Sequence, residues 1–106
     1  MKSLSRVPGF VRTIRNTNRR DVILPRFLTY IVTFTCNARC IMCDSWKMSG
    51  KDDLRLDEIE GIIDQLPRMD AVRLTGGEPF VRQDLSQIAD MVQRKLRPLF
   101  LHVTTN

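Results

Sequence analysis

The chain has 106 residues, of which 42% are hydrophobic and 27% are charged, and its formal net charge at neutral pH is +5. This length allows one domain, and the composition is that of a folded chain, which excludes a disordered protein. No apolar run approaches the ~20 residues of a membrane-spanning helix, and no segment has the pattern of a secretory signal. We therefore expect a cytoplasmic protein, in which thiols stay reduced.

The positive charge is concentrated at the amino end of the chain. Residues 1–20 carry six basic side chains and no acidic one, whereas the rest of the chain carries 11 basic and 12 acidic side chains. We interpret residues 1–25 as a basic, solvated and partly ordered extension that could contact an acidic surface. A weak apolar stripe, which Pro8 and Gly9 are expected to interrupt, consists of Leu4, Val7, Val11 and Ile14.

Strand and helix patterns alternate along the rest of the chain. The segments rich in β-branched and aromatic residues, which predict strands, are residues 26–35, 71–75 and 99–105. Helical spacing of apolar residues lies between them, at residues 57–66 and 84–96. Asp57 with Glu60 fits a capping box for the first helix, and Asp84 is the expected cap of the second. The order β-α-β-α-β predicts an α/β fold with a parallel sheet and right-handed crossovers.

The predicted sheet is small for a parallel one. We expect the first strand to be buried on both faces or nearly so, because it is almost continuously apolar. Three strands and two helices cover little surface, and the third strand has no helix after it. We therefore expect this chain to be the N-terminal part of a longer protein.

All cysteines of the chain lie in one short segment directly after the first strand, at Cys36, Cys40 and Cys43. A disulfide would leave one thiol over and conflicts with a reducing compartment. Structural zinc needs four ligands, and the only histidine, His102, lies in the third strand, where its neighbours indicate a core or near-core position. Three thiolates on one loop can hold three irons of a [4Fe–4S] cluster and leave the fourth open. A zinc module that uses His102 as fourth ligand stays an alternative.

A second segment, "GGEP", follows the second predicted strand. Gly76 and Gly77 have no Cβ, so their backbone can approach a ligand closely. Their carbonyl groups and the carboxylate of Glu78 are acceptors suited to an ammonium group, and Pro79 stiffens the loop. Taken alone, the segment favours a plain β-α turn, because Gly-Gly and Pro are common turn residues. Both loops follow strand carboxyl ends, where parallel α/β folds place active sites.

These two segments carry a family resemblance. "CNARCIMC", residues 36–43, resembles the CxxxCxxC motif of the radical S-adenosylmethionine (SAM) superfamily, and "GGEP" resembles the second motif of that family. The order of the predicted elements is similar to the first three βα units of its core. The resemblance implies that residues 26–106 form the N-terminal half of a radical SAM core domain, a partial (β/α)6 TIM-like barrel, in a truncated chain.

The resemblance also implies an enzyme with two cofactors. Cys36, Cys40 and Cys43 would ligate the [4Fe–4S] cluster, and SAM would bind its fourth iron. Reductive cleavage of SAM would give a 5′-deoxyadenosyl radical that abstracts hydrogen from an unidentified substrate. The electron would come from a low-potential donor of the flavodoxin or ferredoxin type. The protein itself would supply ligation, orientation and exclusion of side reactions.

The resemblance implies a set of SAM contacts as well. The family often has an aromatic residue near the adenine at the position of Met42, and methionine is an adaptable substitute for such packing. The ending "HVTTN" is similar to a stretch that lies beside SAM in the family. The cofactor-binding residues that the resemblance implies are Met42, Gly76, Gly77, Glu78 and Pro79. The alternative function is a non-catalytic, truncated iron–sulfur-binding or structural metal-binding module.

Overall fold

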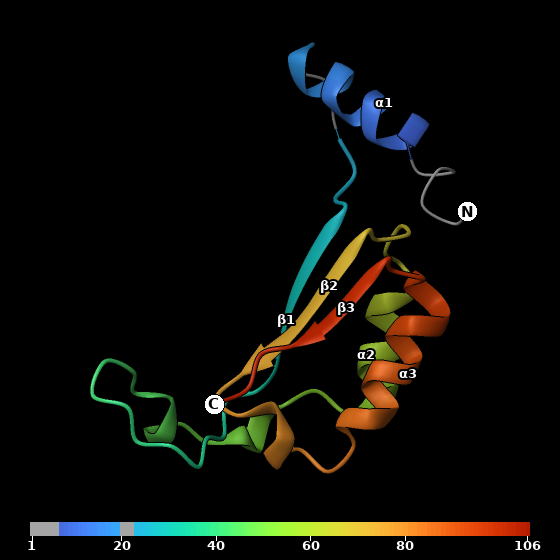
Figure 1. Cartoon of the computed structure of the whole chain (residues 1–106). Coiled ribbons are helices and arrows are strands. Elements are labelled where there is room, and N and C mark those ends of the chain that lie inside the picture. Colours follow the sequence, from blue (N-terminus) through green and yellow to red (C-terminus); the bar gives the residue numbers. More distant parts are fainter. Residues whose placement is uncertain (1–6, 20–22) are drawn as a thin grey trace.

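The computed structural model describes residues 7–19 and 23–106. Three parallel strands form one sheet in the order β1-β2-β3. The strands are β1 (Phe27–Thr33), β2 (Ala71–Gly76) and β3 (Phe100–Val103). The helices between them are α2 (Leu56–Ile63) and α3 (Leu85–Leu96). The predicted order of elements and the parallel pairing are confirmed, and Figure 1 shows α2 and α3 on the same face of the sheet.

The hydrophobic core lies between that face and the two helices. Val72 and Leu74 of the central strand are completely buried, and Ile88 of α3 packs into the same cluster. Alternate residues of a strand and every third or fourth residue of a helix point to one side, which is why these spacings meet here. The buried members of the cluster are Val32, Ile59, Ile63, Met69, Val72, Leu74, Leu85, Ile88, Met91, Val92 and Leu96.

The opposite face of the sheet is open to solvent. Phe27, Ile31 and Phe100 on this face are 56%, 47% and 69% exposed. Arg73 and His102 are neighbours in register on the same face, and both are exposed. The predictions that the first strand is buried on both faces and that His102 lies in or near the core are therefore wrong. The physical reason is that α2 and α3 cover one face, so every second side chain points away from them.

The cap of α2 lies two residues before the predicted one. The backbone N–H of Arg55 donates to the carboxylate of Glu58 at 2.8 Å, which is the capping-box bond expected of Asp57 and Glu60. Asp57 instead forms an exposed ion pair with Arg55, and Glu60 pairs with Lys95 of α3 at 2.9 Å. The acids at 57, 58 and 60 all suit a first turn, so their spacing alone does not select the cap.

A further helix, α1 (Val7–Asn18), lies at the amino ends of the strands in Figure 1, far from the loop that follows β1. The prediction that Pro8 and Gly9 interrupt a helix here is wrong, because Pro8 lies in the first turn, where its missing N–H is not needed. The predicted stripe residue Leu4 lies outside the described residues. None of the helices in the described ranges combines the length and the apolar character needed to cross a membrane.

We predict that the core around Ile88 carries much of the stability of the fold. Ile88→Val removes one methyl group from a fully buried site and should lower the free energy of unfolding by about 1 kcal/mol. Ile62 lies on α2 and is 47% exposed, so Ile62→Val is the matched control and should change it by less than ~0.5 kcal/mol. Urea unfolding measures both, and equal losses would contradict this placement of the core.

Candidate functional site

Both motifs lie at the carboxyl end of the sheet. The cysteine loop, residues 34–55, connects β1 to α2, and the GGEP loop, residues 77–84, connects β2 to α3. Figure 1 shows the two loops meeting there with the end of the chain after β3. The predicted position of both loops at strand carboxyl ends is confirmed.

The backbones of the two loops lie directly against each other. The N–H of Gly77 donates to the carbonyl of Thr33 at 2.9 Å, and the N–H of Glu78 donates to the carbonyl of Thr35 at 2.9 Å. A Cβ on Gly76 would lie 2.4 Å from the Thr33 oxygen, and one on Gly77 would lie 2.4 Å from the Thr35 oxygen. Both glycines are therefore required by the packing of one loop on the other, whether or not a ligand is present.

Glu78 joins the GGEP loop to the end of β3. Its side chain is only 3% exposed, and its carboxylate accepts bonds from the N–H of Phe80 at 3.0 Å and of Asn106 at 2.8 Å. The hydroxyl of Thr105 lies 2.9 and 3.0 Å from the two carboxylate oxygens. Asn106 in turn donates from its amide to Asn37 of the cysteine loop at 3.0 Å. The polar ending "TTN" is the sequence signal of this connection. From the sequence alone, however, Glu78 is expected only to bind a ligand.

The hydrogen bonds keep Glu78 ionised. Burial is the largest single effect on the pKa of Glu78 and raises it. The bonds from Asn106, Phe80 and Thr105 lower that pKa and together outweigh burial, so the pKa of Glu78 lies below its ordinary value. The site therefore contains a fixed, buried negative charge at neutral pH, held by two main-chain N–H groups and one hydroxyl.

The three cysteines are all free thiols on the cysteine loop. Cys36 is half-buried and its sulfur accepts a bond from the N–H of Ala38 at 3.4 Å, whereas Cys40 and Cys43 are exposed. The sulfur of Cys43 lies 3.2 Å from the hydroxyl of Ser45. Hydrogen bonds from the Ser45 side chain and then from its backbone lower the pKa of Cys43, which favours the thiolate, the form that binds metals.

The three sulfurs are not gathered into a preformed metal site. In residues 7–19 and 23–106, no group of three or more His, Cys, Asp or Glu side chains is placed to hold a metal ion. The zinc alternative is likewise not preformed, since His102 lies on the open face of β3. The middle of the loop is unpacked, because Ile41 and Met42 are almost completely exposed, so little buried contact opposes convergence of the thiols. Three reduced thiols on a loop of this kind fit the donor set of an iron–sulfur cluster.

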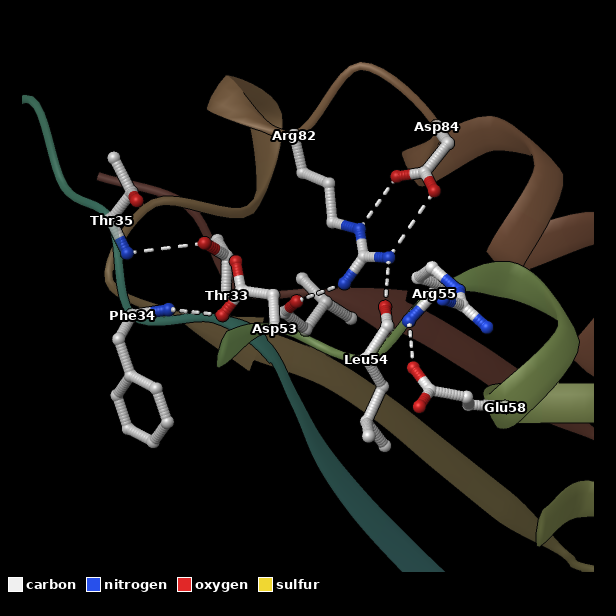
Figure 2. Close-up of polar contacts among 10 residues, drawn as sticks. Thr33, Phe34, Thr35, Asp53, Leu54, Arg55, Glu58, Arg82 and Asp84 are labelled. Carbon is white, nitrogen blue, oxygen red and sulfur yellow. Dashed lines mark hydrogen bonds and ion pairs between the residues drawn. The ribbon is translucent and has the colours of Figure 1, made fainter. Parts of the chain in front are cut away.

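Only the ends of the cysteine loop are tied down. The hydroxyl of Thr35 accepts a bond from the N–H of Gly50 at 3.0 Å, and the carboxylate of Asp53 accepts one from the N–H of Phe34 at 3.3 Å. Figure 2 shows the second of these bonds, together with the N–H of Thr35 donating to the hydroxyl of Thr33. The segment that leaves β1 and the segment that returns to α2 are thus joined at the base of the loop, whereas the side chains at its tip are exposed.

The side chains at the tip of the loop contact no core residue. Met42, for which the resemblance implies an adenine contact, is 96% exposed. Two cations of the same loop lie over the ring of Trp46, with Arg39 5.4 Å and Lys47 5.1 Å from its centroid. Trp46 is not one of the described hydrophobic residues that pack against the core.

Comparison with known proteins places this site in a family context. The profile of the radical SAM superfamily matches residues 30–106. The chain is 37% identical over 95 residues to mycofactocin maturase MftC of Mycolicibacterium smegmatis, which covers 85% of this chain and 23% of that protein. It is 38% identical over 87 residues to GTP 3′,8-cyclase of Cronobacter sakazakii, which covers 76% of this chain and 26% of that protein.

A third relative has a similar extent. The mycofactocin maturase MftC of Mycobacterium tuberculosis is 40% identical over 76 residues, which cover 67% of this chain and 19% of that protein. The chain thus spans about a quarter of the length of the curated relatives that it matches. No solved structure is significantly similar to it.

The bonding of Glu78 predicts a specific dependence of stability on pH. Because its folded pKa lies below the ordinary value of 4.5, the stabilisation is complete above that value and is lost as pH falls through the folded pKa. Glu78→Gln should therefore flatten the decline of the unfolding free energy as the pH falls below 4.5. Thr105→Val removes only one donor and should flatten it less. If denaturation gives the same slope for Glu78→Gln as for the parent chain, the assignment is wrong.

Proposed function

The chain belongs to the radical SAM superfamily, and we propose that it forms the part of such an enzyme that binds a [4Fe–4S] cluster and SAM and starts radical chemistry. The observation that carries this proposal is the direct backbone contact between the cysteine loop and the GGEP loop at the carboxyl edge of a parallel sheet. Each motif alone is open to other readings. The hydrogen bonds of Gly77 and Glu78 to Thr33 and Thr35 support the proposal that both motifs belong to one site.

In this proposal the three thiols ligate the cluster, and the loop that carries them positions it. Cys36, Cys40 and Cys43 ligate three irons and leave the fourth to SAM. When bound, the cluster supplies the electron that cleaves SAM to methionine and a 5′-deoxyadenosyl radical. The exposed tip of the cysteine loop folds around the cluster, and its anchored base fixes where the cluster lies relative to the sheet. The low pKa of Cys43 assists ligation because binding requires the thiolate.

The GGEP loop orients SAM. We assign the ammonium group of SAM to the backbone carbonyls of Gly76 and Gly77, which lie beside the base of the cysteine loop. The oxygens of Glu78 already accept from Phe80, Thr105 and Asn106, so in our proposal Glu78 acts mainly as an anchor and a nearby negative charge. This changes the role that the sequence assigns to Glu78, from direct ligand to organiser of the loop.

Two further residues complete the proposed cofactor site. Pro79 is buried and stiffens the GGEP loop behind Glu78. Met42 lies on the exposed tip of the cysteine loop, and we propose that it packs near the adenine once the loop has closed. The further βα units of a (β/α)6 barrel, the substrate contacts and the flavodoxin- or ferredoxin-type electron donor belong to the proposal at the level of the whole enzyme.

The second candidate function is a non-catalytic metal-binding module. Three free thiols on one loop are also ligands that zinc accepts. The two candidates differ in what the thiols bind. A structural zinc module takes up one zinc per chain and has no visible chromophore, whereas an iron–sulfur site takes up iron with inorganic sulfide and absorbs visible light.

We predict that each cysteine is required for cluster assembly. After anaerobic incubation with iron and sulfide, the parent chain should retain both elements and absorb visible light, because three thiolates hold the cluster. Cys40→Ser should lose most of this iron and sulfide, since a hydroxyl is a poor ligand for iron in such clusters.

Ser49→Ala, on the same exposed loop, is the matched control and should retain the cluster, because the Ser49 hydroxyl accepts its bond from the N–H of Lys51 and not from a cysteine. Iron, sulfide and zinc per chain are measured after gel filtration. Full iron and sulfide in Cys40→Ser would contradict the ligand assignment. Stoichiometric zinc that is lost in His102→Ala would favour the structural module.

A further inference from the structure

Arg82 occupies an unusual position for a charged side chain. It follows the short helix η4 (Pro79–Val81) in the GGEP loop, and its side chain is only 10% exposed. Charged side chains are rarely buried this far unless their donors are paired. The segment "GGEP" ends at Pro79, before this position, and neither of the proposed cofactors accounts for Arg82.

The donors of Arg82 reach both ends of the cysteine loop. One terminal nitrogen donates to the carbonyl of Val32 at 2.5 Å, and the other donates to the carbonyl of Leu54 at 2.5 Å. Val32 ends the regular part of β1, and Leu54 is the residue where the loop returns toward α2. Figure 2 shows the guanidinium of Arg82 bonded to the carbonyl of Leu54 and paired with Asp84. The two carbonyls that Arg82 joins are far apart in the sequence.

The Val32 carbonyl needs such a donor. The pairing register of β1 and β2 shifts between Ile31 and Thr33, which leaves Val32 at an irregularity of the ladder. Val32 is only 1% exposed, so an unbonded carbonyl there would be costly. Arg82 donates a hydrogen bond to this carbonyl at the point where the chain turns into the cysteine loop.

Asp84 orients the guanidinium for this task. Its carboxylate accepts from the Nε of Arg82 at 2.6 Å and from a terminal nitrogen at 3.2 Å. The predicted cap of α3 thus lies at the right residue, but its side chain makes no capping bond. Hydrogen bonding to Arg82 lowers the pKa of Asp84, and bonding to Asp84 raises the pKa of Arg82. The pair is a fixed, charged fork.

We propose that Arg82 is a positioning residue that fixes the two ends of the cysteine loop against each other and against the GGEP loop. The backbone of Arg82 is part of the GGEP loop, through its N–H bond to Pro79 at 3.0 Å. Its side chain therefore couples the loop that we assign to SAM to the base of the loop that we assign to the cluster. The consequence for cluster assembly rests on the proposed function, whereas the clamp itself does not.

A planar fork is needed for this geometry. Arginine has five N–H donors in fixed directions, and four of its hydrogen bonds here go to three different groups. Lysine carries the same charge as a single point and cannot satisfy Val32, Leu54 and Asp84 at once. Arg82→Lys therefore removes the clamp while keeping the charge beside Asp84.

The first test measures amide exchange in the cluster-free chain by NMR. In Arg82→Lys, exchange at Phe34 and Glu78, which lie at the junction of the two loops, should accelerate about tenfold or more relative to Leu74 in the core. Arg94→Met is the matched control, because it removes an exposed Arg–Asp pair on α3. It should change neither the exchange rate of Phe34 nor that of Glu78 relative to Leu74. Equal acceleration at Leu74, or no acceleration, would overturn the clamp.

The second test measures cluster assembly in the same variants. If the clamp sets the spacing of the thiols, Arg82→Lys should retain less than about half of the iron and sulfide that the parent chain retains, although it stays folded. Arg82→Met should lose at least as much, and if it does not fold, Arg82→Lys decides. Full retention in the folded lysine variant would overturn the coupling to the cluster. A parent chain that binds no cluster would refute the proposed function. The exchange data would still test whether Arg82 holds the two ends of the cysteine loop together.

Discussion

The close approach of two backbone segments, residues 33–35 and 76–78, organises this molecule. Two N–H···O bonds join them, and glycine is the only residue that leaves room for the Thr33 and Thr35 carbonyls. β1 and β2 are therefore held side by side beyond the end of their regular ladder. The cysteine loop leaves β1 at this junction, and the GGEP loop leaves β2 there. The position of each loop therefore depends on the other.

Buried charge extends this junction to the rest of the sheet edge. Glu78 draws the end of β3 toward the GGEP loop through Thr105 and Asn106, and Arg82 draws in both ends of the cysteine loop. Both side chains place their charge where main-chain groups satisfy it, which makes burial tolerable. The result is a base that is held by hydrogen bonds and a tip that is exposed to solvent, where Cys40 and Cys43 lie. Such a division suits a site that must form around a cluster and still hold it in one place.

The sequence predicted the order of elements because apolar periodicity and turn residues are local signals. It also predicted the sites at strand carboxyl ends, since parallel connections leave no other place for those loops. It did not predict the open face with His102, because which face the two helices cover is a long-range outcome. The partners of Glu78 and Arg82 were missed for the same reason, since Asn106 and Val32 are distant in the chain. The cap of α2 was misplaced because several acids in that turn satisfy the same local rule.

The central claim is that the two loops form one site for a cluster and SAM. The most direct measurement is electron paramagnetic resonance of the reduced, reconstituted chain, recorded anaerobically with and without SAM. We predict an iron–sulfur signal that changes shape when SAM is added, because SAM binds the iron that the three thiols leave open. A signal that saturating SAM leaves unchanged, or a folded chain that assembles no cluster, would contradict the account.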